Sequence, residues 1–360
     1  MINNQKRHIA TRNQDHYSRH YGEEWGLSGC GWKVWDYPVE LEPPYYPYIS
    51  ARYRNQSIID DGKKDSLSVT LGKWVSKPFA KKNFGGAEAT SEEQKPKTFA
   101  FGESLKELQC SIPLESRIKI DAARDLLLTL PNSNNPTVFE IISTSNEIQT
   151  QFVSHANADG LRQHIKGYFP DVVLTDPEYS LVEKWHDTSQ NTLILELGLT
   201  DSFYITLTTS DNFEVDPLIP VFSALENVKQ GELGIIQVMF QPAQGKWKDG
   251  ACNVLEHIQS KAGETARSSL NKVRQPLFSV VLRIAVQAHS EERTKQLARS
   301  LVGAFKGFHN PAGNSFIPLD NKGYPDPRHI RDLLQRKSLL YCGCFQVRLY
   351  GGRFEHGSFP

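Results

Sequence analysis

The sequence predicts an α+β fold with a largely antiparallel sheet. Regular hydrophobic patterns begin near Ile118, and the order helix, strand, strand, helix, strand then occurs twice, over 118–174 and 217–319. The spacing of the predicted elements over 100–320 suits helices packed on one face of a largely antiparallel sheet. The repeated order is typical of duplicated ferredoxin-like, or split βαβ, units. An irregular N-terminal arm precedes them.

The first unit is predicted from alternating and helical hydrophobic periods. A helix is expected over "RIKIDAARDLLLTL", because four apolar residues share one helical stripe: Ile120, Ala123, Leu127 and Leu130. Two β-patterned runs around "STSN" predict a hairpin. A second helix is expected after Asn157, a good N-cap, with a stripe of Leu161, Ile165 and Tyr168. The run "DVVLTD" predicts a closing strand.

The second unit repeats the order with an added helix between its paired strands. Asp216 and Pro217 favour a helix start, and Gly231 favours its stop. "LGIIQVMFQP" predicts a strand. "FSVVLRIAVQA" predicts another, with one face buried and the other partly wet. Ser290 is the expected cap of the next helix, and "NSFIPL" predicts a last strand. "NTLILELGL" and "SFYITLTTS" predict two further strands between the units.

Composition shifts divide the chain into four predicted regions. They are an irregular N-terminal arm over 1–104 with a mobile linker at about 76–97, a first α+β unit over 105–210, a second over 211–320 with a helical insert at about 250–273, and a C-terminal region over 321–360.

Charge and cysteine usage restrict the classes of protein. Lys+Arg and Asp+Glu each number 41, so there is no overall basic surplus of the kind that duplex binding usually needs. Five widely spaced cysteines favour reduced thiols in the cytoplasm over a disulfide framework. No run of about 18 apolar residues occurs, which predicts no transmembrane segment.

Motifs for catalysis and cofactors are not found. No G-x-x-x-x-G-K-[ST] occurs, and Gly72-Lys73 is followed by Trp74, so the sequence predicts no phosphate-binding loop. G-x-S-x-G is absent. Cys342-Gly-Cys344 lacks the second pair that would complete a structural zinc site, which leaves incidental thiols as the favoured interpretation. The prediction is therefore no catalytic residue, no cofactor and no metal.

Histidines fall at two equivalent places of the repeat. His155 and His289 each stand at the end of a predicted strand, just before a helix. Loops there can host function. A polar residue in a strand-to-helix turn is the favoured interpretation, because matching turns follow from the repeat itself.

Two basic segments are candidates for contact with nucleic acid or a protein partner. "YISARYRNQ" carries Arg52 and Arg54. "DPRHIRDLLQRK" predicts an amphipathic helix with Ile330, Leu333 and Leu334 facing inward. Its outward residues would be Arg328, Arg331, Arg336 and Lys337. A solvated helix face is the plainer interpretation of that helix.

The stretch from about Leu105 to Leu340 resembles a known family. The segments "TVFEIIS", "LRQHIKGYFPDVVL", "ILELGL", "DPLIPVFSALENVKQGELGIIQVMFQPA" and "FSVVLRIAVQAHSEERTKQLARSLVGAFKGFHNPAGNSFIPL" resemble the region preceding the motor in conjugative-transfer, type IV secretion-type ATPases related to the HerA/FtsK translocases. Such proteins pump DNA through a hexameric ATP-driven ring. The resemblance implies a non-catalytic accessory or assembly domain, which is cytoplasmic or peripheral to a membrane secretion complex.

The resemblance also implies partners, and it has a limit. Self-association or binding to a motor ATPase domain is implied, with DNA contact through a local basic face. Neither Walker motif is present, so no catalytic residue is carried over and the chain itself is expected not to be an enzyme. The ending "CGCFQVRLYGGRFEHGSFP" departs from the family, which a truncation or a shifted reading frame would explain. The alternatives are a free-standing protein-interaction module unrelated to DNA or, less favoured, an enzyme whose pocket gathers histidines and carboxylates.

Overall fold

The structure is a computed structural model that describes eleven stretches of the chain. They are residues 34–42, 97–99, 105–113, 120–129, 136–154, 158–186, 191–200, 203–209, 212–213, 215–319 and 324–339. All belong to one compact unit, residues 1–43 with 96–360; the other unit, 44–95, lies outside the described residues. Apart from Lys97, the predicted linker over 76–97 also lies outside them. No helix in the described stretches combines the length and apolarity needed to cross a membrane.

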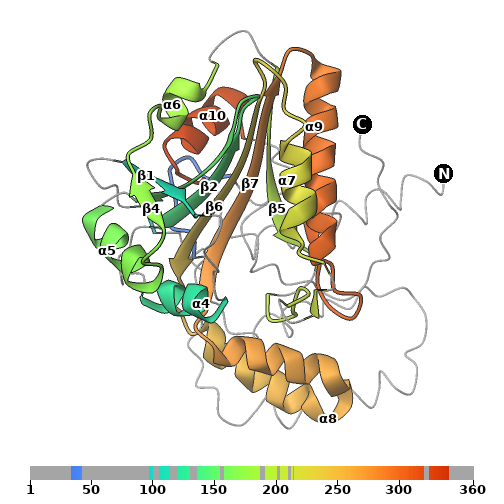
Figure 1. The fold of residues 1–360 in the computed structure, drawn as a ribbon. Helices are drawn as coiled ribbons and strands as arrows, with labels where there is room; N and C mark the ends of the chain where they lie inside the picture. Colours follow the sequence, from blue (N-terminus) through green and yellow to red (C-terminus); the bar gives the residue numbers. More distant parts are fainter. Residues whose placement is uncertain are drawn as a thin grey trace, which may run out of the picture. The chain divides into compact units, whose positions relative to one another are not determined.

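The described residues form an eight-stranded sheet in which all neighbouring strands are antiparallel (Figure 1). The strand order is β4-β1-β3-β2-β6-β7-β5-β8. The strands are β1 (Lys106–Ser111), β2 (Thr137–Ser143), β3 (Ile148–Ser154), β4 (Val173–Thr175), β5 (Asn191–Leu199), β6 (Leu233–Pro242), β7 (Phe278–Ala288) and β8 (Phe316–Pro318). The predicted α+β class with a largely antiparallel sheet is confirmed.

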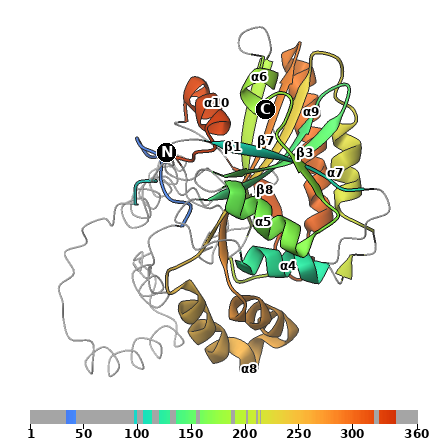
Figure 2. The ribbon, with the colours of Figure 1, turned by 60° about the vertical axis from the view of Figure 1, so that its left-hand side comes forward.

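Eight helical elements accompany the sheet in the described part of the chain. They are α4 (Ile120–Thr129), α5 (Ala158–Tyr168), α6 (Leu181–Lys184), α7 (Leu218–Leu225), α8 (Trp247–Arg274), α9 (Glu291–Ala304), the 3-10 turn η2 (Phe305–Phe308) and α10 (Asp326–Leu334). Figure 2 shows α7 and α9 on one side of the sheet and α10 on the other.

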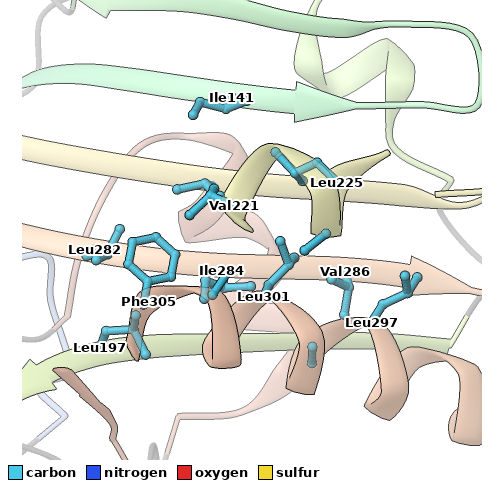
Figure 3. Close-up of a cluster of buried hydrophobic side chains, with 14 of the residues drawn as sticks. Ile141, Leu197, Val221, Leu225, Leu282, Ile284, Val286, Leu297, Leu301 and Phe305 are labelled. Atoms are coloured by element: carbon cyan, nitrogen blue, oxygen red, sulfur yellow. The ribbon is translucent and has the colours of Figure 1, made fainter. Parts of the chain in front are cut away.

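One face of the sheet packs against α7 and α9. Side chains alternate between the faces of a strand, so Leu282, Ile284 and Val286 of β7 all point to this face. They meet Leu297 and Leu301 of α9 in one buried cluster (Figure 3). Burying each such side chain contributes about 1.5–3 kcal/mol, so this cluster is a main source of stability. At the far end of the same face, α4 and α5 cover β1, β3 and β4.

The opposite face is also covered, which corrects the prediction of helices on one face only. Leu333 of α10 packs in a cluster with Ile142, Ile235 and residues of α6. Leu41, from the segment 34–42, packs with Met239 and Val281. The second face of β7 is therefore dry rather than partly wet: its polar residues Ser279, Arg283 and Gln287 are all 1% exposed or less.

The helical insert predicted at about 250–273 is α8, and it doubles back on itself (Figure 1). A straight helix of 28 residues would be about 42 Å long. Lys248 Nζ nevertheless donates a hydrogen bond to the Arg274 carbonyl at 2.7 Å, so the first and last turns lie side by side. Near these turns, Lys272 Nζ donates to the Phe203 carbonyl at 2.5 Å, which ties the insert to residues 203–209.

Several local predictions agree with the structure. The hairpin is β2–β3, and the runs "NTLILELGL" and "LGIIQVMFQP" are β5 and β6. Ser290 caps α9, since its hydroxyl accepts from the Arg293 N–H at 3.2 Å. Asp216 accepts from the Leu218 N–H at 2.9 Å, but the N-cap of α7 is Pro217, one residue later than predicted. The expected cap Asn157 lies outside the described residues.

Two local predictions are wrong. Residues 203–209 of the run "SFYITLTTS" form turns and irregular chain rather than a strand. Among the α4 side chains that the structure describes, Leu126 is buried at 5% exposure, whereas Leu127 of the predicted stripe is 38% exposed. The helix is rotated by about one residue relative to the predicted stripe, because α5 and β1 determine which face is covered.

Two neighbouring leucines of α4 test the orientation of this helix. Leu126→Ala is expected to lower the free energy of unfolding by about 2–4 kcal/mol, because it leaves a cavity against α5. Leu127→Ala is the matched control and should cost less than about 0.5 kcal/mol, since its side chain is largely in solvent. Urea unfolding followed by circular dichroism measures both. Equal losses would contradict the observed orientation of α4.

Candidate functional site

A row of polar side chains crosses the middle of the sheet on the face beneath α10. Its members are Gln151 on β3, Glu140 on β2, Gln237 on β6, Arg283 on β7 and Glu196 on β5. Each is the direct cross-strand partner of the next, so all five point to the same face. Each is 2% exposed or less. We refer to these five residues as the polar row.

The polar row lies between two apolar clusters on that face. One contains Ile142, Ile235 and Leu333, and the other contains Val138, Met239 and Leu41. Charged groups in such surroundings lose their hydration, which costs several kcal/mol per ion unless partners replace the water. Glu140 and Glu196 therefore need partners that replace their water.

Residues 324–339, which we call the C-terminal segment, supply many of these partners. Arg336 donates through Nε to Glu140 Oε1 at 2.9 Å and through Nη2 to Glu140 Oε2 at 3.0 Å. Its Nη2 also donates to Glu107 of β1. The Arg336 side chain is 1% exposed, so it forms a buried ion-pair triad with two carboxylates.

The backbone at Arg336 is held in an unusual conformation. Its φ of 52° lies in the left-handed region, which favours glycine. The Arg336 N–H donates to Leu333 O at 3.1 Å, and the Lys337 N–H donates to Asp332 O at 2.8 Å. This is the hydrogen-bond pattern of a Schellman motif, whose left-handed residue is usually glycine. An arginine at this position carries strain of roughly 1 kcal/mol or more, which its two carboxylate partners offset.

The other end of the polar row is held by α10 as well. His329 Nε2 lies 2.8 Å from Glu196 Oε1, and Arg283 Nε donates to the same oxygen at 2.9 Å. The ring of His329 stacks on Tyr324 at a centroid separation of 4.0 Å. Tyr324 in turn donates its hydroxyl to Asp332 Oδ2 at 2.9 Å.

The middle of the polar row binds backbone carbonyls of the C-terminal segment. Gln237 Nε2 donates to Leu333 O at 3.1 Å, and Arg283 Nη1 donates to Lys337 O at 2.7 Å. Gln237 Nε2 also donates to Glu140 Oε1 at 2.8 Å. Side chains of the sheet therefore bind the main chain of the segment as well as its side chains.

The pKa values of the buried groups follow from these contacts. Burial raises the pKa of Glu196, but His329 and Arg283 outweigh it and lower the pKa to about 2. The pKa of Glu140 is also lowered, because Arg336 and the amides of Gln151 and Gln237 outweigh burial. Burial raises the pKa of Tyr324, so it stays a neutral hydroxyl. Since the Glu196 carboxylate can only accept, His329 Nε2 must carry a hydrogen and donate it.

The depressed pKa of Glu196 predicts a loss of stability in acid. Its folded pKa of about 2 lies below the ordinary value of 4.5, so its contribution is complete above pH 4.5 and is lost as the pH falls towards 2. The difference corresponds to about 3 kcal/mol. Urea unfolding at pH 5, 4 and 3 measures the decline, which Glu196→Gln should make shallower. Glu226→Gln, which replaces an exposed carboxylate, is the control. If the free energy of unfolding falls with pH as steeply in both variants as in the unaltered chain, the assignment to Glu196 fails.

The arrangement is suited to holding a chain segment. Most of its donors and acceptors are engaged with one another, while Arg283 Nη2 and Arg328 Nε are buried without a hydrogen-bond partner. In the described stretches, no three His, Cys, Asp or Glu side chains are placed to hold a metal ion. Cys110 and Cys252 are free thiols there, and burial raises the pKa of Cys110.

The structure separates the four basic residues predicted to share the outer face of α10 and its extension. Arg331 is exposed. Arg328 is half-buried and donates to the Asp36 carbonyl. Lys337 is half-buried and donates to the Gln335 side chain at 2.8 Å. The outward placement of Arg336 is wrong, because the left-handed turn directs its side chain to Glu140.

The remaining sequence candidates stay untested. Arg52, Arg54 and His155 lie outside the described residues. His289 is exposed and its Nε2 lies 3.1 Å from the Gln230 carbonyl. Contact of the basic residues with nucleic acid or a partner stays a prediction, as does the division of the chain into four regions.

The polar row itself was missed from the sequence, although a signal existed. Four of the apolar strands carry one strongly polar residue near the middle: "VFEII", "LILELGL", "GIIQVMF" and "VVLRIAV". An isolated polar residue within a buried strand needs a partner. Four such residues, each near the middle of its strand, indicate a row of polar side chains across the sheet.

A comparison with family models finds one match. Residues 120–276 match the model described as "Domain of unknown function (DUF8128)". This interval includes Glu140, Glu196 and Gln237 and ends before Arg283 and the C-terminal segment. It covers less than half of the chain. No curated protein matches the sequence.

Several solved structures that are similar to this chain are oxidoreductases. A xylooligosaccharide oxidase from Myceliophthora thermophila C1, solved with xylobiose, has 14% identity and a TM-score of 0.34 over 70% of this chain and 57% of its own. Aclacinomycin oxidoreductase has 10% identity and a TM-score of 0.30 over 58% and 42%. A chitooligosaccharide oxidase has 9% identity and a TM-score of 0.31 over 71% and 57%. The chain thus spans about half the length of these proteins.

This comparison corrects two predictions. These solved structures are enzymes and not components of a DNA-translocating ATPase, so the prediction of a non-catalytic accessory domain of such an ATPase is wrong on this finding. The prediction that the chain is not an enzyme is overturned by the same matches. TM-scores of 0.34 and below do not carry an oxidase activity over to this chain. The resemblance to the region before the motor of conjugative-transfer ATPases is not tested and stays a prediction.

Proposed function

We propose that the sheet is a docking scaffold for its own C-terminal segment, residues 324–339. In this proposal the polar row recognises the segment and fixes the place and direction in which the chain runs on after α10. The observation that carries the proposal is Arg336, a buried arginine in a left-handed backbone conformation that is paired with Glu140 and Glu107.

Chemical complementarity between the two surfaces supports the proposal. The sheet offers two carboxylates, Glu140 and Glu196, to a guanidinium and an imidazole of the segment. It offers two N–H donors, on Gln237 and Arg283, to two carbonyls of the segment. Buried ion pairs contribute less to net stability than to the choice of partner, because a wrong partner leaves a charge unpaired. The polar row is therefore suited to selecting this segment.

The proposal is tested by cutting the connection to the segment. A protease site inserted between Leu319 and Tyr324 is cleaved in the folded protein, and the products are separated by size-exclusion chromatography. The C-terminal fragment is expected to stay bound to the sheet, and to be released when the cut chain carries Arg336→Met. Arg331→Met, on the exposed side of α10, is the control and should retain the fragment. Release of the unaltered fragment on cleavage would contradict docking.

We infer that the two halves of the sheet are related ferredoxin-like units. The order β4-β1-β3-β2 in one half corresponds to β8-β5-β7-β6 in the other, which supports the inference. In each half the helices follow the first and third strands, and α8 is the extra element. An experimental structure in which these quartets of strands fail to superpose would contradict it.

The finer predictions about partners and location stay proposals. Self-association is supported by three apolar side chains exposed at the start of α7, Val215, Leu218 and Ile219. Sedimentation equilibrium of Ile219→Asp against the unaltered chain tests it.

DNA contact is supported only by the exposed Arg331, and a gel-shift assay with Arg331→Glu tests it. The free thiols of Cys110 and Cys252 support a cytoplasmic location, and exclusively secreted protein in cell fractionation would contradict it.

A further inference from the structure

We propose that the C-terminal segment opens and closes as one cooperative unit with two distant stretches of chain, residues 34–42 and 97–99. We call the three stretches together the clasp. The inference rests on the proposed docking function and adds its regulation: Arg336 locks the clasp over the polar row, and breaking that lock releases all three stretches together.

The stretch 34–42 is joined to the C-terminal segment through its backbone. The Trp35 N–H donates to Leu339 O at 3.1 Å, and the Val39 N–H donates to Ser338 O at 2.9 Å. Arg328 of α10 donates to the Asp36 carbonyl. Val39 and Leu339 are each 0% exposed, so these bonds are buried. If the C-terminal segment left, buried N–H groups of 34–42 would lose their acceptors.

The stretch 97–99 is joined to 34–42 from the other side. The Glu40 N–H donates to Lys97 O at 3.0 Å, and the Phe99 N–H donates to Pro38 O at 3.0 Å. Val39 and Thr98 form an antiparallel bridge. The stretch 34–42 is thus the middle member of the clasp, with backbone hydrogen bonds to both neighbours. It carries the coupling between the outer two.

The parts of the clasp are also anchored separately on the rest of the protein. These anchors would favour independent opening of the parts. Arg336 anchors the C-terminal segment at Glu140. Leu41 anchors the stretch 34–42 in the cluster with Met239. The Glu42 carboxylate accepts the Gly245 N–H at 2.7 Å, just before α8. If these anchors dominate, the two parts open independently; if the backbone bonds dominate, they open together.

Joint opening would have a defined consequence. The polar row would lose Arg336, His329 and the carbonyls that Gln237 and Arg283 bind, so two carboxylates and a guanidinium would face solvent together. Residues 42 and 97, the last and first members of their stretches, would be freed in the same event. One lock would then control both the polar row and the two ends of the chain between these residues.

The first test uses the unaltered full chain. Native-state hydrogen exchange in low urea measures an opening free energy and its urea dependence for each protected amide. The amides of Val39 and Phe99 are expected to share one opening reaction with those of Arg336 and Lys337. Amides in the middle of β6 and β7 should open separately and with higher free energy. Different urea dependences within the clasp would overturn the inference.

The second test breaks the lock and then the middle member. Arg336→Met is expected to speed exchange at Val39, Phe99 and Lys337 alike, by about 100-fold or more. Leu41→Ala should speed exchange at Lys337 as well, because coupling is reciprocal. Faster exchange in 324–339 alone would overturn the clasp and leave docking intact, whereas no change in either place would contradict docking too. If Arg336→Met does not fold, the first test decides.

Discussion

Arg336→Met is expected to lower the free energy of unfolding by about 3–5 kcal/mol, one of the two largest effects predicted for a single substitution. The reason is that Glu140, which is 0% exposed, would keep its negative charge without a cation. Its remaining partners would be the amides of Gln151 and Gln237. Urea unfolding at neutral pH measures the loss. A loss below about 1 kcal/mol would contradict the role given to this ion pair.

A matched variant separates the side chain of Arg336 from its backbone. Arg336→Gly removes the same guanidinium but suits the φ of 52°, so it should be more stable than Arg336→Met by about 1 kcal/mol. Arg331→Met, on the exposed side of α10, should change stability by less than about 0.5 kcal/mol. If the glycine variant were no more stable than the methionine variant, the backbone at this position would not be strained.

Arg283→Met is expected to lower the free energy of unfolding by a similar amount, about 3–5 kcal/mol. Arg283 lies towards the other end of the polar row, beside Glu196. Glu196 would lose the guanidinium that donates to its Oε1, and the Lys337 carbonyl would lose the hydrogen bond from Arg283 Nη1. Arg299→Met, an exposed arginine on α9, is the control. A second variant that also changes Glu196 to Met should recover part of the loss, since an apolar pair of similar volume tolerates burial better than one unpaired charge. No recovery would show that the loss has another cause.

Local periodicity was sufficient to predict most of the sheet. β2, β3, β6 and β7 follow from alternating or continuous apolar runs, and α9 follows from its cap at Ser290 and the stripe that includes Leu297 and Leu301. These features depend on residues close together in sequence. The order of these elements along the chain could therefore be written from the sequence, whereas β1 and α6 were not predicted.

Features that depend on distant segments could not be predicted in the same way. The alternation in β7 correctly placed the side chains of Arg283 and Leu282 on different faces of the sheet. The face with Arg283 was expected to be partly exposed to solvent. Its actual cover, residues 324–339, is supplied by α10 and the turn after it. Arg336 was misplaced because the helical pattern was continued past Leu334, where the chain turns left-handed at a residue that is not glycine.

The ion pair between Glu140 and Arg336 holds the C-terminal segment on the sheet, and a double-mutant cycle measures its interaction energy directly. The free energy of unfolding is determined for the unaltered chain, Glu140→Gln, Arg336→Met and the double variant. We expect an interaction energy of about 2–3 kcal/mol, because each partner is buried and the other supplies its opposite charge. A value below about 0.5 kcal/mol would mean that the two substitutions act independently, and would contradict docking through the polar row.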